Sequence, residues 1–242
     1  MNAITVRGLT KDFGSFRAVD DLSFDVPSGA VTGFVGANGS GKTTTMRAML
    51  GLLPVTSGST KYGDCSYAEL DEPRRQVGAV VDRIGAHPGH TARRHLQMIA
   101  MAAALPIGRV DDALAEVGLA DVADRPLRKY SMGMMQRCAL AAALLGSPDI
   151  LILDEPANGL DPAGIRWLRD KTRSWADEGR AVFVSTHQLA ELAAVVDRLV
   201  IVDHGRLVYE GDADELTAAG QSLEDAVFDL LAGLTGGSRV YQ

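Results

Sequence analysis

The chain has 242 residues, of which 46% are hydrophobic, 23% charged and 5% aromatic, a composition typical of a globular domain with an aliphatic core and not of a disordered chain. Its formal net charge of -7 argues against nonspecific binding to nucleic acid. The two cysteines, Cys65 and Cys138, lie far apart, which indicates neither a disulfide framework nor a zinc site.

The sequence predicts a cytoplasmic protein in a reducing compartment. Its amino-terminal residues show no apolar stretch of signal-peptide length behind a basic start. The most apolar windows, 96–105 and 138–146, are too short to span a bilayer, which needs about 20 residues. Any role at a membrane is therefore expected to depend on a partner.

Strand and helix patterns alternate along the chain. Alternation with period two predicts strands, and longer stretches with helical spacing between glycines and prolines predict helices. In chain order, the predicted elements are paired strands at 4–13 and 18–29, a buried strand at 30–36, a helix from 42 that Pro54 stops, a strand at 76–82, a helical stretch at about 86–145, a strand at 149–154, a helix at 162–179, a strand at 181–187, a hairpin at 199–211 around His204 and Gly205, and an amphipathic helix at 222–234.

Strands that alternate with helices predict an α/β fold with a mainly parallel sheet, covered on both faces, whose ligands bind at the carboxyl ends of the strands. The helical stretch at about 86–145 is interpreted as a subdomain inserted between two core strands. Residues 1–242 are expected to form one domain with a helical tail at about 213–242. The tail residues expected to pack on the core, with a dimer contact as the alternative, are Val227, Phe228, Leu231 and Leu234.

The segment GANGSGKT matches the phosphate-loop pattern G-x-x-x-x-G-K-[ST] and lies between a buried strand and a helix, where that pattern belongs. Its glycines let backbone N–H groups converge on phosphate oxygens, the helix start adds a positive dipole, and the lysine supplies a charge to the β and γ phosphates. The hydroxyl of Thr43 is expected to bind Mg²⁺. The alternative is a glycine turn with a chance lysine. The predicted phosphate-binding residues are Gly36, Ala37, Asn38, Gly39, Ser40, Gly41, Lys42, Thr43 and Thr44.

Two acids and a histidine end two of the buried strands. Asp154 and Glu155 follow the apolar run of 150–153, where Asp154 can hold Mg²⁺ through water and Glu155 can act on a proton. The alternative is a pair of solvated turn residues. His187 ends the next strand at the same edge of the sheet. This position favours a catalytic role over the structural role that a lone histidine usually has.

The order of these features resembles the nucleotide-binding subunit of an ABC (ATP-binding cassette) transporter over residues 4–212. The phosphate loop, the helical block, a serine that begins a helix, the acidic strand end, the GLD segment at 159–161 and the histidine follow the family's order. The resemblance implies a P-loop NTPase (RecA-like) core with an N-terminal antiparallel β subdomain and an inserted helical subdomain, and it implies ATP and Mg²⁺ as ligands.

The same resemblance assigns roles to single residues. Glu155 matches the glutamate that polarises the attacking water, His187 the residue that contacts the γ-phosphate, and Asp161 the aspartate of the loop that crosses to the other subunit. Phe13 would stack on adenine, where the family usually has tyrosine. Phe16 is the alternative, and either phenylalanine could instead be a core residue.

The segment YSMGMMQR stands where the family has its signature, commonly LSGGQ. It departs from that form at Tyr130, Met132 and Met134 and retains Ser131 and Gly133. Ser131 as an N-cap offers a hydroxyl at a helix start, and Gly133 lets the backbone approach an anion. The resemblance implies that both residues complete the ATP site of a second subunit. The SMGM form is similar to exporters of drugs, antibiotics and polysaccharides (the ABC-2 type).

A second departure lies at Asp82, where the family normally has a glutamine that reaches Mg²⁺ and whose loop senses the membrane subunit. Aspartate is shorter and charged, so it would act on Mg²⁺ and nucleotide through water or serve only as a hinge. By resemblance, the loop at 83–96 would receive the coupling helix of a membrane partner. The alternative is a solvated loop with basic residues.

The resemblance therefore implies an ATPase that forms a head-to-tail dimer, most simply a homodimer, and powers a separate transmembrane permease from the cytoplasmic face of the membrane. Two other classes stay open at this point. One is an ABC-type ATPase without a transporter, as in iron-sulfur assembly. The other is a P-loop kinase of a small molecule, which would leave the signature serine and the histidine at the strand end unexplained.

Overall fold

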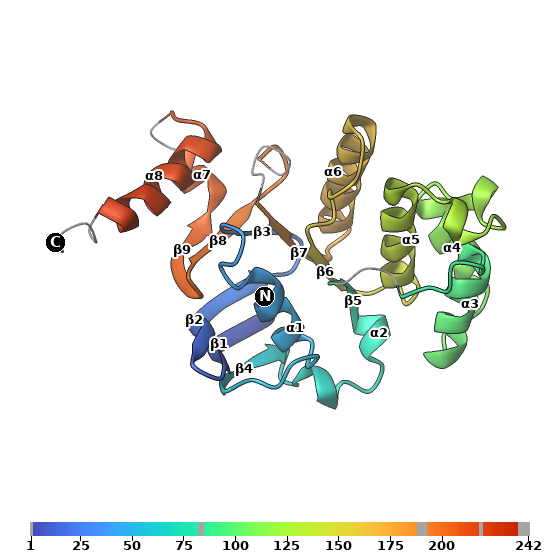
Figure 1. Ribbon diagram of the computed structural model, residues 1–242, viewed down its shortest axis with the longest axis horizontal. Helices are drawn as coiled ribbons and strands as arrows, with labels where there is room; N and C mark the ends of the chain where they lie inside the picture. Colours follow the sequence, from blue (N-terminus) through green and yellow to red (C-terminus); the bar gives the residue numbers. More distant parts are fainter. Residues whose placement is uncertain (1, 82–84, 188–192, 218–219, 237–242) are drawn as a thin grey trace.

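The structure, a computed structural model, describes residues 2–81, 85–187, 193–217 and 220–236. Two sheets form its centre (Figure 1). The first is an antiparallel sheet of order β2-β1-β4, in which β1 (Asn2–Phe13) pairs with β2 (Phe16–Pro27), as the sequence predicts.

The third strand of this sheet, β4 (Ser57–Tyr62), is absent from the sequence prediction. Its sequence, SGSTKY, is polar and largely exposed, so it lacks the alternation that reports a buried face. It forms because the free edge of β1 accepts it. Gly58 has a φ of +83°, and a Cβ there would lie 2.2 Å from the backbone oxygen of Gly8, so only glycine allows this close approach.

The second sheet has the order β5-β6-β7-β3-β8-β9. Its neighbouring strands run parallel from β5 to β8, and β9 is antiparallel to β8, which confirms the expected mainly parallel sheet. The register pairs Val35 with Thr186 and Asp154 with Ser185, so the carboxyl ends of β3, β6 and β7 meet at one edge. The strands are β3 (Val31–Val35), β5 (Val77–Val80), β6 (Ile150–Asp154), β7 (Ala181–Thr186), β8 (Arg198–Asp203) and β9 (Arg206–Asp212).

Helices surround this sheet, with α3, α4 and α5 gathered at one end of the molecule and α7 and α8 at the other (Figure 1). In the described part of the chain, no helix is both long and apolar enough to cross a membrane. The helices are α1 (Lys42–Met49), α2 (Pro73–Gln76), α3 (Ala92–Ala102), α4 (Arg109–Glu116), α5 (Met132–Leu144), α6 (Pro162–Asp177), α7 (Ala213–Thr217) and α8 (Leu223–Gly236).

Helix α1 ends earlier than the sequence predicts, and Gly51 rather than Pro54 stops it. Gly51 has a φ of +67°, and its N–H donates to the oxygen of Ala48, while the N–H of Leu52 donates to that of Arg47. These two bonds are the Schellman closure that a glycine at this position permits.

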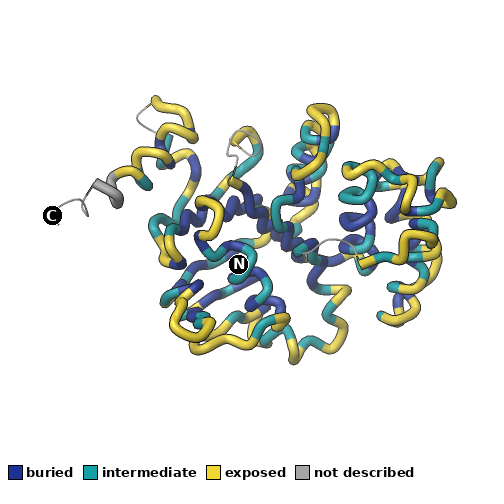
Figure 2. The backbone as a smooth tube through the Cα atoms, in the orientation of Figure 1, coloured by how far each residue is buried: buried dark blue, intermediate teal, exposed yellow. Residues whose placement is uncertain are grey.

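The buried residues follow the central sheet through the whole molecule (Figure 2). Most are aliphatic, as expected, but three of the phenylalanines form a stacked group where β2, β3 and β7 face one another. The ring centroids of Phe24, Phe34 and Phe183 lie 5.0–5.7 Å apart. This group joins the antiparallel sheet to the central sheet, because Phe24 lies in one and the other two lie in the other.

The tail packs on the side of β8 and β9. Val227 is 3% exposed in a cluster with Leu199 and Ile201, and Leu231 is half-buried against it, as predicted. The prediction for Phe228 is wrong, because this side chain is 70% exposed: it follows Val227 by one residue and so points about 100° around the helix from it. The side chain of Leu234 lies outside the part described.

Candidate active site

The phosphate loop joins β3 to α1 and is held close to its neighbours. A Cβ at Gly36 would lie 2.3 Å from the oxygen of Val202, and one at Gly41 would lie 2.5 Å from the oxygen of Ala18. Gly41 also has a φ of +101°, which favours glycine. The loop therefore depends on these two glycines to pass over β8 and β2.

The interior of this loop presents polar groups to the position of a ligand. Ser40 donates its N–H to Ala37 and accepts a bond from the N–H of Gly205, whereas its hydroxyl is buried with no hydrogen-bond partner among the described residues. A buried hydroxyl without a protein partner indicates a ligand oxygen or water. Thr44 is half-buried in the first turn of α1, and Ala37, Asn38 and Gly39 are exposed, which leaves the loop accessible to a phosphate chain.

Lys42 lies beneath the loop and is 5% exposed. Its Nζ donates to the oxygens of Gly36 at 2.7 Å and Ala37 at 3.0 Å. Burial lowers the pKa of Lys42, and the carboxylates of Glu155 and Asp154 oppose that shift. The ammonium group is thus held inside the loop by carbonyl oxygens that a phosphate oxygen can replace as its acceptors.

Two oxygen ligands converge below the loop. Thr43 Oγ1 donates to Asp154 Oδ2 at 2.6 Å, and Ser185 Oγ donates to Asp154 Oδ1. Hard oxygen atoms are what Mg²⁺ binds, and this ion takes one or two carboxylates and completes its shell with water and substrate phosphates. No group of three or more His, Cys, Asp or Glu residues in the described ranges could hold a metal ion by itself. Thr43 and Asp154 therefore fit a magnesium ion shared with a nucleotide.

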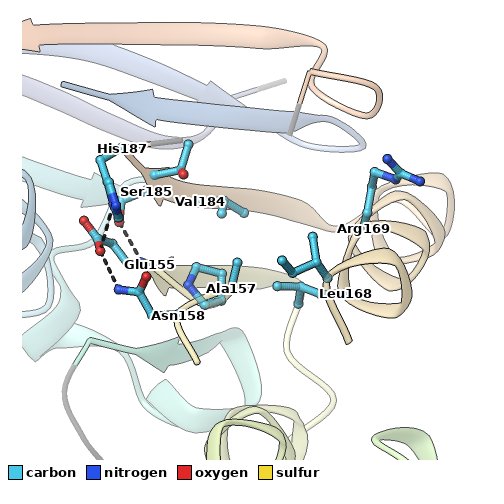
Figure 3. Close-up of a pocket in the computed structure, with 11 residues that line it drawn as sticks. Glu155, Ala157, Asn158, Leu168, Arg169, Val184, Ser185 and His187 are labelled. Carbon is cyan, nitrogen blue, oxygen red and sulfur yellow. Dashed lines mark hydrogen bonds and ion pairs between the residues drawn. The ribbon is translucent and has the colours of Figure 1, made fainter. Parts of the chain in front are cut away.

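Glu155 stands directly after Asp154, and its side chain faces Asn158 and His187 (Figure 3). Its φ of +45° lies in the left-handed region, which is uncommon for a residue with a side chain. Its backbone N–H donates to Ser185 Oγ at 2.8 Å. Its Oε2 accepts a bond from Asn158 Nδ2 at 2.5 Å and lies 3.1 Å from His187 Nδ1. The fold thus brings Glu155 and His187 together, as the two strand ends predict.

Sequence reasoning missed Ser185 and Asn158. Ser185 is fully buried and bonds to both acids at once, because the parallel register places it beside Asp154. The sequence does hold a signal for Ser185: it is a polar residue near the end of a largely apolar strand, and that strand lies next to the strand that ends in the two acids. Asn158 follows Glu155 by three residues, a spacing that fits a turn, but a turn residue has no recognisable chemistry of its own.

The signature segment begins α5. Ser131 is the N-cap, as predicted, and its hydroxyl accepts a bond from the N–H of Met134 at 3.2 Å. Ser131 is exposed, and Met132 is 68% exposed. A Cβ at Gly159 would lie 2.2 Å from the sulfur of Met132, and one at Gly133 would lie 3.5 Å from the oxygen of Gly159. The helix start therefore packs against the turn after β6 in the same chain.

The two signature methionines have different surroundings. Met134 is half-buried against the helical core, as is Met135, and Cys138 is fully buried there. Burial raises the pKa of Cys138 to about 12, so its thiol stays protonated and unreactive. Met132 lines a cavity of about 660 Å³ together with Met135, Thr43 and residues of the acidic strand end, whereas Met134 does not line it.

The structure gives the surroundings of three of the four remaining predicted residues. Phe13 ends β1, is 48% exposed, and has Lys11 Nζ 4.8 Å from its ring centroid. Phe16 pairs with it and is 63% exposed, so neither is a core residue. Asp161 is the N-cap of α6 and accepts a bond from the N–H of Gly164 at 2.7 Å. Asp82 lies outside the described residues.

Known proteins are similar to this chain in sequence and in architecture. The sequence profile of the ABC transporter family matches residues 19–158. The bacitracin transport ATP-binding protein of Bacillus licheniformis is 39% identical over 216 residues, which cover 88% of this chain and 71% of the relative. The daunorubicin/doxorubicin resistance ATP-binding protein of Streptomyces peucetius is 36% identical over 222 residues, 90% of this chain and 67% of the relative.

Similarity extends to a third relative and to a solved structure. The lantibiotic transport ATP-binding protein of Streptococcus pyogenes is 30% identical over 211 residues, 87% of this chain and 91% of the relative. A structure of an ATP-binding subunit of an ABC transporter superposes with a TM-score of 0.85 at 27% identity, over 95% of this chain and 99% of that one. Because the profile covers more than half of the chain and the relatives align over most of both lengths, the chain belongs to the ABC transporter family.

Proposed function

We propose that this chain binds and hydrolyses ATP and thereby powers a separate membrane permease, most simply an exporter. The observation that carries the proposal is the meeting of the phosphate loop, the Thr43–Asp154 pair and the Glu155–His187 pair at one edge of the sheet. Relatives named for antibiotic transport and drug resistance support export.

The phosphates and the base have separate places in this site. The N–H groups of the phosphate loop and Lys42 bind the β and γ phosphates, and Phe13 stacks on adenine from the end of β1. Thr43 and Asp154, which are hydrogen-bonded to each other at 2.6 Å, would hold Mg²⁺ beside these phosphates. When bound, Mg²⁺ neutralises the charge of the phosphate oxygens.

The protein residues then act on water and leaving group. Glu155 orients a water molecule and accepts its proton as the water oxygen attacks the γ-phosphorus. The bond between that phosphorus and the bridging oxygen breaks, and ADP keeps the electron pair. His187, 3.1 Å from Glu155 in this structure, turns to the γ-phosphate when ATP is present.

The signature segment serves a second copy of the chain. Ser131 is exposed at the start of α5, and a helix start with free N–H groups attracts an anion. We place its hydroxyl and the backbone at Gly133 against the ATP held by the phosphate loop of the partner, so that two chains enclose two nucleotides head to tail. Asp161 lies at this interface, at the start of α6.

A groove beside α2 and α3 is the docking place for the permease. It has a volume of about 890 Å³, and its lining includes Arg74, His87, His90, Met98 and Leu105. His87 and His90 belong to the loop at 83–96, which by resemblance receives the coupling helix of the membrane partner. The chain would thus bind the cytoplasmic face of the membrane through its partner, and membrane fractionation with and without the permease tests this placement.

The reaction is tested by Glu155→Gln. This substitution keeps the shape of the side chain but not its basicity, so we expect ATP binding to persist while phosphate release falls by about 10²–10⁴-fold and an ATP-bound dimer accumulates in gel filtration. Glu178→Gln, beyond the far end of α6, is the control and should retain full activity. Hydrolysis at the parental rate by Glu155→Gln would refute the assignment.

The head-to-tail arrangement is tested with two inactive variants, Lys42→Ala and Ser131→Ala. In a mixed dimer, the phosphate loop of the Ser131→Ala chain and the signature of the Lys42→Ala chain form one intact site. Mixing should therefore restore phosphate release and a nucleotide-bound mixed dimer. If the mixture is no more active than the two variants alone and no mixed dimer forms, the arrangement is wrong.

A further inference from the structure

We infer that Asn158 is a positioning residue for Glu155, which it holds in the orientation needed to receive the proton of the attacking water. The inference rests on the proposed role of Glu155 in ATP hydrolysis. Its basis is the bond of 2.5 Å from Asn158 Nδ2 to Glu155 Oε2, made within one tight turn at the end of β6 (Figure 3).

Two side-chain nitrogens approach the same carboxylate oxygen from different elements. His187 Nδ1 approaches Glu155 Oε2 from the end of β7 at 3.1 Å, and Asn158 approaches it from its own turn. When His187 turns to a γ-phosphate, the amide of Asn158 is the donor of this pair that stays on Oε2. A carboxylate has two oxygens, each able to accept two bonds, so an anchored Oε2 directs Oε1 to the water.

The backbone around Glu155 makes this anchor effective. The N–H of Glu155 is fixed to Ser185, and its φ of +45° sets the direction of the side chain. The backbone N–H of Asn158 donates to the oxygen of Glu155 at 3.1 Å, which closes the turn. Because both ends of the turn are fixed, only the side-chain torsions of Glu155 are left to vary, and the hydrogen bond from the amide of Asn158 restricts them.

The turn itself is supported from outside. Met132, at the start of α5, lies over Gly159, which is the residue after Asn158. A Cβ on Gly159 would lie only 2.2 Å from the sulfur of Met132. Gly159 has a φ of +80°, which lets the turn leave Asn158 facing Glu155. Met132 therefore packs on the turn that carries Asn158.

Substitution of Asn158 tests the role, since the residue is exposed and its replacement should leave the fold intact. Asn158→Asp and Asn158→Ala remove the donor, and we expect kcat for ATP hydrolysis to fall by about 10–100-fold, as for a displaced catalytic group, with KM for ATP changed less than about twofold. Asn158→Gln restores an amide and should recover most of the loss.

A double-variant comparison separates this role from a general structural one. If Asn158 acts through Glu155, adding Asn158→Ala to Glu155→Gln should lower the residual rate no further. Glu155, Asn158 and His187 line one end of a pocket, and Arg169 lies at its other end (Figure 3). Arg169→Gln is therefore the control and should leave kcat unchanged. An equal loss from Asn158→Ala with and without Glu155 would overturn the inference.

The outcomes also distinguish the inference from the proposed function. An inactive Glu155→Gln with a fully active Asn158→Ala overturns only the role of Asn158. A Glu155→Gln that hydrolyses ATP at the parental rate overturns the proposed function itself. The inference is supported if kcat falls for Asn158→Ala and Asn158→Asp while KM and the melting temperature stay unchanged, and if Asn158→Gln recovers kcat.

Discussion

Ser185 is the residue whose removal should reveal most about how this site is built. One hydroxyl, fully buried on β7, donates to the carboxylate of Asp154 and accepts the N–H of Glu155. Ser185→Ala removes both bonds and changes the volume of the site by a single oxygen. The effects on stability and on turnover can then be measured in the same variant.

The size of the effect on stability follows from the two bonds. A hydrogen bond to an ionised carboxylate contributes about 1.5–3 kcal/mol, and a neutral one about 0.5–1.5 kcal/mol. Ser185→Ala should therefore lower the free energy of unfolding by about 2–4.5 kcal/mol. Asp154 keeps its bond from Thr43, but its other oxygen and the backbone of Glu155 are released, so kcat should fall by about 10–100-fold.

Thr32→Val is the matched control for this measurement. Thr32 is also fully buried, on neighbouring β3, but its hydroxyl has no hydrogen-bond partner within the ranges described. Replacing it with a side chain of the same shape should leave stability unchanged or raise it by up to about 1 kcal/mol. Urea unfolding and phosphate release are measured on both variants. If Ser185→Ala loses no more stability than Thr32→Val, the hydroxyl does not hold the two acids.

Two further perturbations test the loop and the groove. Gly36→Ala places a Cβ 2.3 Å from the oxygen of Val202 and should weaken ATP binding more than about tenfold, whereas Gly108→Ala, with open space around its Cβ, should bind ATP normally in the same equilibrium assay. Burial, and then repulsion from His90, lower the pKa of His95, so below its unfolded-state pKa of about 6.5 the unfolded chain binds a proton that the folded chain does not. The neutral His95 therefore carries no penalty above that pH, and the free energy of unfolding falls as the pH is lowered below it. His95→Gln should make this fall smaller when unfolding is measured between about pH 5 and 8. An unchanged pH dependence would contradict the lowered pKa.

Much of the fold and of the phosphate chemistry is readable from local patterns. The apolar strands at the sheet centre, the loop GANGSGKT and the acids after 149–153 are each encoded by adjacent residues, because a strand, a phosphate loop and a strand end are short-range structures. The N-cap at Ser131 is readable for the same reason: the hydroxyl bonds three residues away.

Other features depend on which segments pack together. β4 is polar and becomes a strand only because the edge of β1 accepts it. Helix α1 stops at a glycine whose closing bonds replace the expected proline. Phe228 is apolar but lies on the outer side of α8. In each case the local residues permit more than one outcome, and contacts from distant residues select one.

The positions of the catalytic groups belong to the same class. Periodicity places Glu155 and His187 at the ends of two strands, but the register of those strands decides that Ser185 bonds to both acids. The geometry of one turn, packed beneath Met132, decides that Asn158 reaches Glu155. Side-chain identity is a property of the sequence alone, whereas distances of about 3 Å between residues far apart in the chain exist only after the sheet has formed.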